Sequence, residues 1–263
     1  MAIYMDQTGK TIMLPGIPNR IVSLVPSQTE LLYDLGLDKA VTGITKFCIH
    51  PPHWFRNKTR IGGTKAVHTD AVTALQPDLI IANKEENVKE QVDALAAKFP
   101  VWTSDIRNLQ QSLQMIESIG AVTGTVAKAQ AMTDEIKTRF SQLKAPPTVI
   151  RTAYLIWQDP YMTIGGDTFI HDMLAHCGFE NIFANRLRYP TISIEEIGNL
   201  HCQLLLLSSE PFPFKQSHIA ALQKQLPATK IMLVDGEMFS WYGSRLLLAP
   251  AYFEKLSCAF FSS

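Results

Sequence analysis

Residues 121–144, AVTGTVAKAQAMTDEIKTRFSQLK, decide the fold that the sequence predicts. The stretch has no proline and is rich in residues that favour a helix. Its apolar residues recur every three or four positions and so line one side of a helix; they are Val126, Ala129, Met132, Ile136, Phe140 and Leu143. Pro146 and Pro147 follow and cannot continue a helix. We therefore predict one unbroken helix over 121–144, about 30 Å long at roughly 1.5 Å per residue.

Short apolar strands alternate with amphipathic helices on both sides of this stretch. Buried strands are predicted at residues 20–25, 40–45, 78–82 and 101–103, and again at 148–157, 204–208 and 231–234. Such alternation predicts an α/β fold with mostly parallel central sheets. We expect an amino-terminal α/β lobe over 1–120, a connecting helix over 121–145 and a carboxyl-terminal α/β lobe over 146–263, with a ligand cleft between the lobes.

Composition excludes several classes of function. The 263 residues carry no formal net charge and the pI is about 7.0, so the sequence predicts no nucleic-acid partner. No apolar run approaches the roughly 18 residues of a membrane span. The first residues, MAIYMDQTGK, lack the features of an export signal. We expect a chain that acts in the cytoplasm, or a mature form from which a signal has been removed.

Two serines stand where helices are expected to begin. Ser27 follows the strand over 20–25 directly, and Glu30 comes three positions later. Ser193 and Glu196 repeat this spacing. The pattern predicts a capping box, in which the serine and the acid each accept a backbone N–H at the start of a helix.

The common catalytic and nucleotide-binding motifs are absent from the sequence, and we predict a protein that is not an enzyme and has no catalytic residue. One loop does carry unusual chemistry, because Cys48, His50, His53 and His68 follow one another closely. A direct zinc, manganese or iron site on the three histidines is an alternative. We favour the same loop as the wall of a pocket for a larger ligand, with no metal ion bound directly by the protein.

A second informative run, DGEMFSWYGSR over 235–245, follows a buried strand. Large aromatic residues beside an arginine suit a flat, partly apolar ligand. The alternative is that Phe239, Trp241 and Tyr242 pack the last helix onto its lobe.

These stretches together resemble the helical-backbone (class III) family of periplasmic solute-binding proteins of ABC importers. The resemblance covers residue 20 to the carboxyl terminus and includes RIVSLVPSQTELLYDLGL (20–37), ALQPDLIIA (74–82), the long helix, CGFENIF (177–183) and the aromatic–arginine run. Members bind cobalamin, ferric siderophores, haem or metal ions. The cobalamin and ferric-siderophore group is most similar, although Thr64 and Asn83 stand where cobalamin-binding members carry tryptophan.

The resemblance implies which residues face a ligand between the lobes. On the first lobe these are Phe47, His50, Thr64 and Asn83; on the second they are Trp157, Tyr189, Phe239, Trp241, Tyr242 and Arg245. It also implies that one acidic residue on each lobe docks on the transmembrane permease, and Glu86 and Glu210 are the candidates.

The sequence therefore predicts the substrate-binding protein of an ABC importer. We expect it to hold a cobalt- or iron-containing chelate (a corrinoid, a ferric siderophore or haem) and to deliver it to the permease. No further cofactor is expected. The resemblance implies a monomer in the periplasm, or at the outside of the inner membrane. Two alternatives stay open: a direct metal-ion receptor that uses His50, His53 and His68, and a cytoplasmic corrinoid- or haem-handling protein on the same fold.

Overall fold

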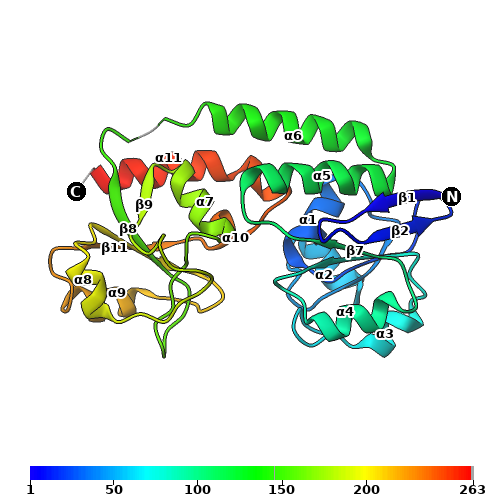
Figure 1. Cartoon of the computed structure of the whole chain (residues 1–263), viewed down its shortest axis with the longest axis horizontal. Coiled ribbons are helices and arrows are strands. Elements are labelled where there is room, and N and C mark those ends of the chain that lie inside the picture. Colours follow the sequence, from blue (N-terminus) through cyan, green and yellow to red (C-terminus); the bar gives the residue numbers. More distant parts are fainter. Residues whose placement is uncertain (145, 262–263) are drawn as a thin grey trace. The chain divides into compact units, whose positions relative to one another are not determined.

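The computed structural model of the chain describes residues 1–144 and 146–261. These residues form two compact units (Figure 1). The first unit contains Met1–Ile106, Gln110–Glu135 and Tyr242–Arg245, and the other described residues belong to the second. Each unit has its own sheet and is described by itself.

The first unit is built on a five-stranded parallel sheet with the strand order β5-β4-β3-β6-β7. Its strands are β3 (Ile21–Ser23), β4 (Val41–Ile44), β5 (Thr59–Arg60), β6 (Leu79–Asn83) and β7 (Val101–Ser104). Every residue of β3, β6 and β7 is buried. Strands covered on both faces read as continuous apolar runs, which is why the sequence reveals them.

Helices and one hairpin complete the first unit (Figure 1). The hairpin is formed by β1 (Ala2–Met5), which pairs antiparallel with β2 (Thr11–Leu14). The helices are α1 (Pro26–Asp34), α2 (Pro52–Asn57), α3 (Thr69–Ala74), α4 (Lys89–Ala96) and α5 (Leu109–Thr123).

The second unit is built on a four-stranded parallel sheet with the order β11-β10-β8-β9. Its strands are β8 (Ile150–Leu155), β9 (Phe179–Asn181), β10 (Leu204–Ser208) and β11 (Lys230–Val234). The helices that follow α6 (Val126–Ser141) are α7 (Phe169–His176), α8 (Ile194–Asn199), α9 (Gln216–Gln223), α10 (Glu237–Ser240), the 3-10 turn η1 (Ser244–Leu247) and α11 (Ala249–Phe261). The prediction of an α/β fold with mostly parallel sheets is confirmed.

The prediction of one unbroken helix over 121–144 is wrong at both ends. Helix α5 ends at Thr123, and a separate helix, α6, runs from Val126 to Ser141. Gly124 has φ = +71°, and the Thr125 amide donates to the Gly120 carbonyl at 2.7 Å. This is the hydrogen bond of a Schellman motif, which ends a helix with a left-handed glycine.

Helix α6 links the two units along the chain, since the division falls between Glu135 and Ile136. The lobe limits at 120 and 146 stay a prediction, and residue 145 lies outside the described residues. The two compact units differ from those limits most clearly at Tyr242–Arg245, which belongs to the first unit. Over residues 1–144 and 146–261, each helix is either too short or too polar to cross a lipid bilayer.

The two expected capping boxes have different outcomes. At α8 the serine half of the box is observed: the Ser193 side chain accepts the Glu196 amide at 3.1 Å, and the Glu196 carboxylate pairs with Arg186. The box at Ser27 is wrong. Helix α1 begins at Pro26, and its N-cap residue, Val25, makes no side-chain capping bond. Glu30 therefore lies in the second turn of α1, where its carboxylate is available for another partner.

We predict that Gly124→Ala lowers the free energy of unfolding by at least 1–2 kcal/mol, the approximate cost of a left-handed non-glycine residue. An added Cβ would also lie 2.7 Å from Ile17 Cδ1. Urea unfolding should show a lower midpoint with an unchanged m-value. Gly16→Ala is the control, because nothing lies within 4 Å of its added Cβ. Equal midpoints for the two variants would contradict the assignment.

Candidate functional site

The order of strands in each sheet reverses at one place, and this reversal marks the edge where an open α/β sheet binds ligands. In the first unit the reversal lies between β3 and β6, and in the second between β8 and β10. Ligands of such sheets bind outside the carboxyl ends of the strands at this switch point. The residues that follow β3, β6, β8 and β10 are therefore the first candidates for a site.

An exposed tryptophan lies at the switch point of the second unit. Trp157 follows β8 and is 40% exposed. Its ring meets Phe212 edge to face, with 5.7 Å between ring centroids, and the Phe212 amide donates to the Ile156 carbonyl at 3.3 Å. Trp157 also forms an antiparallel bridge with Met162. The indole is thus a supported aromatic surface at the carboxyl edge of the sheet.

Glu210 follows β10 at the same edge and is held in one orientation. Its Oε1 accepts hydrogen bonds from Ser240 Oγ at 2.7 Å and from Trp241 Nε1 at 2.9 Å. Burial raises the pKa of this carboxyl above its ordinary value, although the two hydrogen bonds act in the opposite direction. The Trp241 side chain is itself buried and serves as the donor that fixes Glu210.

The remaining aromatic candidates of the second unit differ in exposure. Phe239 is fully buried and packs on Tyr154 and Phe253, with ring centroids 5.3 and 4.9 Å apart. It therefore packs α11 against the sheet, which is the alternative considered for it. Tyr189 is half-buried, and the Arg188 guanidinium lies 5.5 Å from its ring centroid.

The switch point of the first unit is a network of buried amides and hydroxyls. Asn83 is 2% exposed; its Nδ2 donates to Ser104 Oγ at 3.0 Å, and its Oδ1 accepts the Glu86 amide at 2.9 Å. Asn87 Nδ2 donates to the Thr64 carbonyl at 3.0 Å. Asn83 and Thr64, both predicted to face a ligand, therefore also shape the loop that carries Glu86. The Tyr242 hydroxyl donates to Glu86 Oε1 at 2.9 Å.

Arg245 is paired within the first unit. Its Nε and NH2 groups donate to the two carboxylate oxygens of Glu30 at 3.0 and 2.7 Å, and its side chain is 9% exposed. Burial raises the pKa of Glu30, while Arg245 and, more weakly, His50 act to lower it. The resemblance implies the second lobe for Tyr242 and Arg245, but both belong to the first unit.

The candidate residues on the loop after β4 contact different neighbours. Phe47 is 51% exposed, and Lys46 Nζ lies 5.1 Å from its ring centroid. His53 packs on Tyr33, with ring centroids 5.3 Å apart. Among residues 1–144 and 146–261, no three side chains of His, Cys, Asp or Glu form a group that could hold a metal ion. The structure therefore lends no geometric support to a site on His50, His53 and His68.

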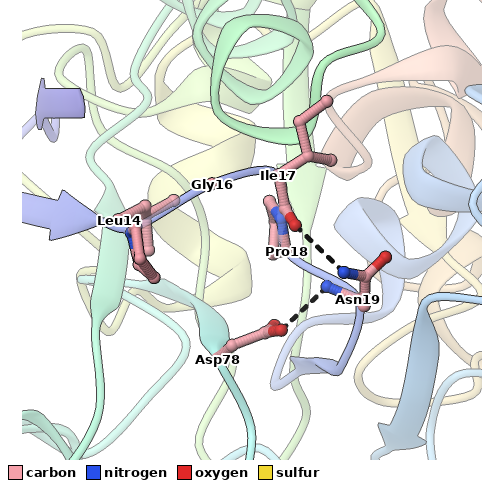
Figure 2. A pocket seen from close by; sticks show the side chains of 7 residues that line it. Leu14, Gly16, Ile17, Pro18, Asn19 and Asp78 are labelled. Carbon is pink, nitrogen blue, oxygen red and sulfur yellow. Dashed lines mark hydrogen bonds between the residues drawn. The ribbon is translucent and has the colours of Figure 1, made fainter. Parts of the chain in front are cut away.

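A pocket of about 310 Å³ lies elsewhere in the first unit (Figure 2). It is lined by the loop after β2 and by Asp78, which accepts the amides of Asn19 and Arg20 at 2.8 and 2.9 Å. These residues precede β6 and β3, so the pocket lies at the amino edge of the sheet, opposite the switch point. Asp78 there serves to anchor a loop.

The comparisons with known proteins agree with this architecture. The family described as periplasmic binding protein matches residues 21–230. The chain belongs to this family. A vitamin B12-binding protein of Photorhabdus laumondii is 26% identical over 241 residues, which cover 88% of this chain and 85% of that protein.

Two solved structures show how closely the fold of this periplasmic binding protein follows its relatives. A periplasmic vitamin B12 binding protein of Vibrio cholerae has a TM-score of 0.76 at 20% identity, covering 94% of this chain and 99% of that chain. A periplasmic heme-binding protein of Roseiflexus sp. RS-1 also has a TM-score of 0.76 at 20% identity, covering 94% and 98%. At this identity the likeness establishes the fold.

Sequence reasoning missed two polar residues of this periplasmic binding protein. Glu30 was assigned to a capping box, and Pro26 in front of Ser27 was the signal that the helix begins earlier. Ser240 was passed over between two aromatic residues, although it donates the shorter of the two bonds to Glu210. A serine in that position carries no local sequence signal.

We predict that Arg245→Ala lowers the free energy of unfolding by about 3–5 kcal/mol, because it leaves the buried Glu30 carboxylate without its cation. The variant loses the cation that lowers the pKa of Glu30 and keeps the burial that raises it. A raised folded-state pKa gives stability that is present at low pH and is lost as pH rises. The loss should therefore be larger at pH 7 than at pH 5 in urea titrations.

Adding Glu30→Gln to Arg245→Ala should restore part of the stability at pH 7. Arg151→Ala, which breaks the half-exposed pair with Glu180 and a hydrogen bond to the Leu200 carbonyl, should lower the free energy of unfolding by only about 1–2 kcal/mol. If the two arginine variants lose the same free energy of unfolding at both pH values, the pair with Glu30 is not the cause of the loss in Arg245→Ala.

Proposed function

We propose that this chain is the substrate-binding protein of an ABC importer and that its ligand is a chelated metal: a corrinoid, a ferric siderophore or haem. Membership of the periplasmic binding protein family carries the proposal, together with the 26% identical relative named for vitamin B12 binding. The family consists of solute-binding proteins, so binding and transfer, with no chemical conversion, is the activity proposed. The periplasm is the compartment that the family suggests.

The geometry of the second unit supports a large, flat and partly apolar ligand. Trp157 offers an exposed indole at the switch point, and Phe212 holds that ring from behind. Aromatic faces bind planar conjugated systems through stacking and through burial of apolar area. A bare metal ion would need converging ligand atoms instead.

Delivery of the ligand requires docking on a transmembrane permease. Docking through Glu86 stays a prediction: its carboxylate is half-buried and accepts the Tyr242 hydroxyl, so its orientation is constrained. A constrained carboxylate loses little entropy when it pairs with an arginine of a partner. The docking role expected for Glu210 also stays a prediction.

We predict that cyanocobalamin, haemin or a ferric siderophore quenches the tryptophan fluorescence of the purified chain with saturable binding. Trp157→Ala should weaken that binding about ten-fold, equivalent to roughly 1.4 kcal/mol, because the exposed stacking surface is lost. Trp102→Phe is the control, since Trp102 is fully buried in β7 and should leave the affinity unchanged. No saturable quenching with any of the three ligands would refute the chelate proposal.

A further inference from the structure

Glu210 is a half-buried acid, and the partners of its carboxylate among residues 1–144 and 146–261 carry no positive charge. Both donors to its carboxylate, Ser240 and Trp241, are neutral. The charged groups that bear most strongly on it are Glu237 and Asp235, which are also acidic. Glu30 in the first unit is the contrast, because a guanidinium compensates its burial. A carboxylate kept from water without a cation costs stability, and such groups are concentrated at functional sites.

The surroundings of Glu210 keep this costly group in place. Ser208 Oγ donates to the Glu210 carbonyl at 2.6 Å and also receives the Tyr154 hydroxyl at 3.1 Å. Gly236 leaves room for the side chain, because a Cβ there would lie 2.6 Å from Glu210 Cγ. Contacts from β8 and β10 thus hold the backbone at Glu210, while Ser240 and Trp241 hold its carboxylate. A side chain built in this way is preorganised before any ligand arrives.

The position of Glu210 indicates what this carboxylate meets. It follows β10 at the switch point, and the segment it begins runs beside the segment that carries Trp157, through the Phe212–Ile156 hydrogen bond. Both loops leave the same edge of the sheet, where the ligand is proposed to bind. We propose that Glu210 selects ligands by charge: it accepts a cationic or N–H-bearing part of the ligand and disfavours anionic ligands.

This inference rests on the proposed function and gives Glu210 a role toward the ligand; docking on the permease is the alternative role for the same residue. Haem presents carboxylate groups, which a fixed and partly desolvated anion repels. The carboxamide side chains of a corrinoid donate N–H groups, and a hydroxamate siderophore such as ferrioxamine B carries an ammonium group. The favoured ligand class is therefore a neutral, amide-rich corrinoid or a cationic ferric hydroxamate.

The test measures binding of cyanocobalamin, ferrioxamine B and haemin to the full chain and to Glu210→Gln by isothermal titration calorimetry. Glutamine keeps an oxygen for Ser240 and Trp241 and removes only the charge. The unmodified chain should bind cyanocobalamin or ferrioxamine B more tightly than haemin. Glu210→Gln should lower the affinity for the favoured ligand at least five-fold. It should also reduce the ratio of that affinity to the affinity for haemin. Glu254→Gln, the same change at an exposed position of α11, should alter neither affinity.

The possible results separate the two levels of the proposal. If one ligand binds tightly and Glu210→Gln leaves its affinity unchanged, the charge-selection role is overturned and the carrier function stands. A preference of the unmodified chain for haemin would do the same. Failure of all three ligands to bind would count against the proposed function, and the inference about Glu210 would fall with it. Loss of the Glu210→Gln effect in high salt would fit a charge effect.

Discussion

The ion pair between Arg245 and Glu30 completes the interior of the first unit. The two residues are 215 positions apart in the chain, yet their side chains make two hydrogen bonds and lie mostly out of water. The same short segment brings the Tyr242 hydroxyl to Glu86 and the Gly243 amide to Ser112. A buried charge without its partner is unfavourable. The first unit therefore reaches its full stability only when the chain is present as far as Arg245.

Glu30 and Glu210 illustrate two uses of a carboxylate away from water. The fold brings the Arg245 guanidinium to Glu30, and this ion pair helps to hold α1 and the Tyr242–Arg245 segment together. Glu210 has hydroxyl and indole donors that fix its direction and leave its charge in place. The first arrangement serves stability. The second is expected where a protein must recognise a complementary charge from outside.

The sequence predicts the sheets well, because β6 and β10 are buried along their whole length and so appear as unbroken apolar runs. It also predicts that Trp157 lies at a strand end, where the structure shows an exposed ring. It fails where one residue changes the local geometry: Gly124 looks like a tolerated glycine inside a helix but ends α5 in a left-handed conformation. It also fails for Arg245, whose partner is set by packing across 215 residues, and no local pattern contains that information.

The neighbouring residues Trp241 and Tyr242 bond to acids of different units: the indole to Glu210 in the second and the phenol to Glu86 in the first. The chain passes from the second unit to the first at the peptide bond between Trp241 and Tyr242. A single cut inside α6 therefore cannot yield two complete halves. A fragment that ends at Glu135 would lack the last four residues of its own unit, and would need them supplied as a grafted tail or an added peptide.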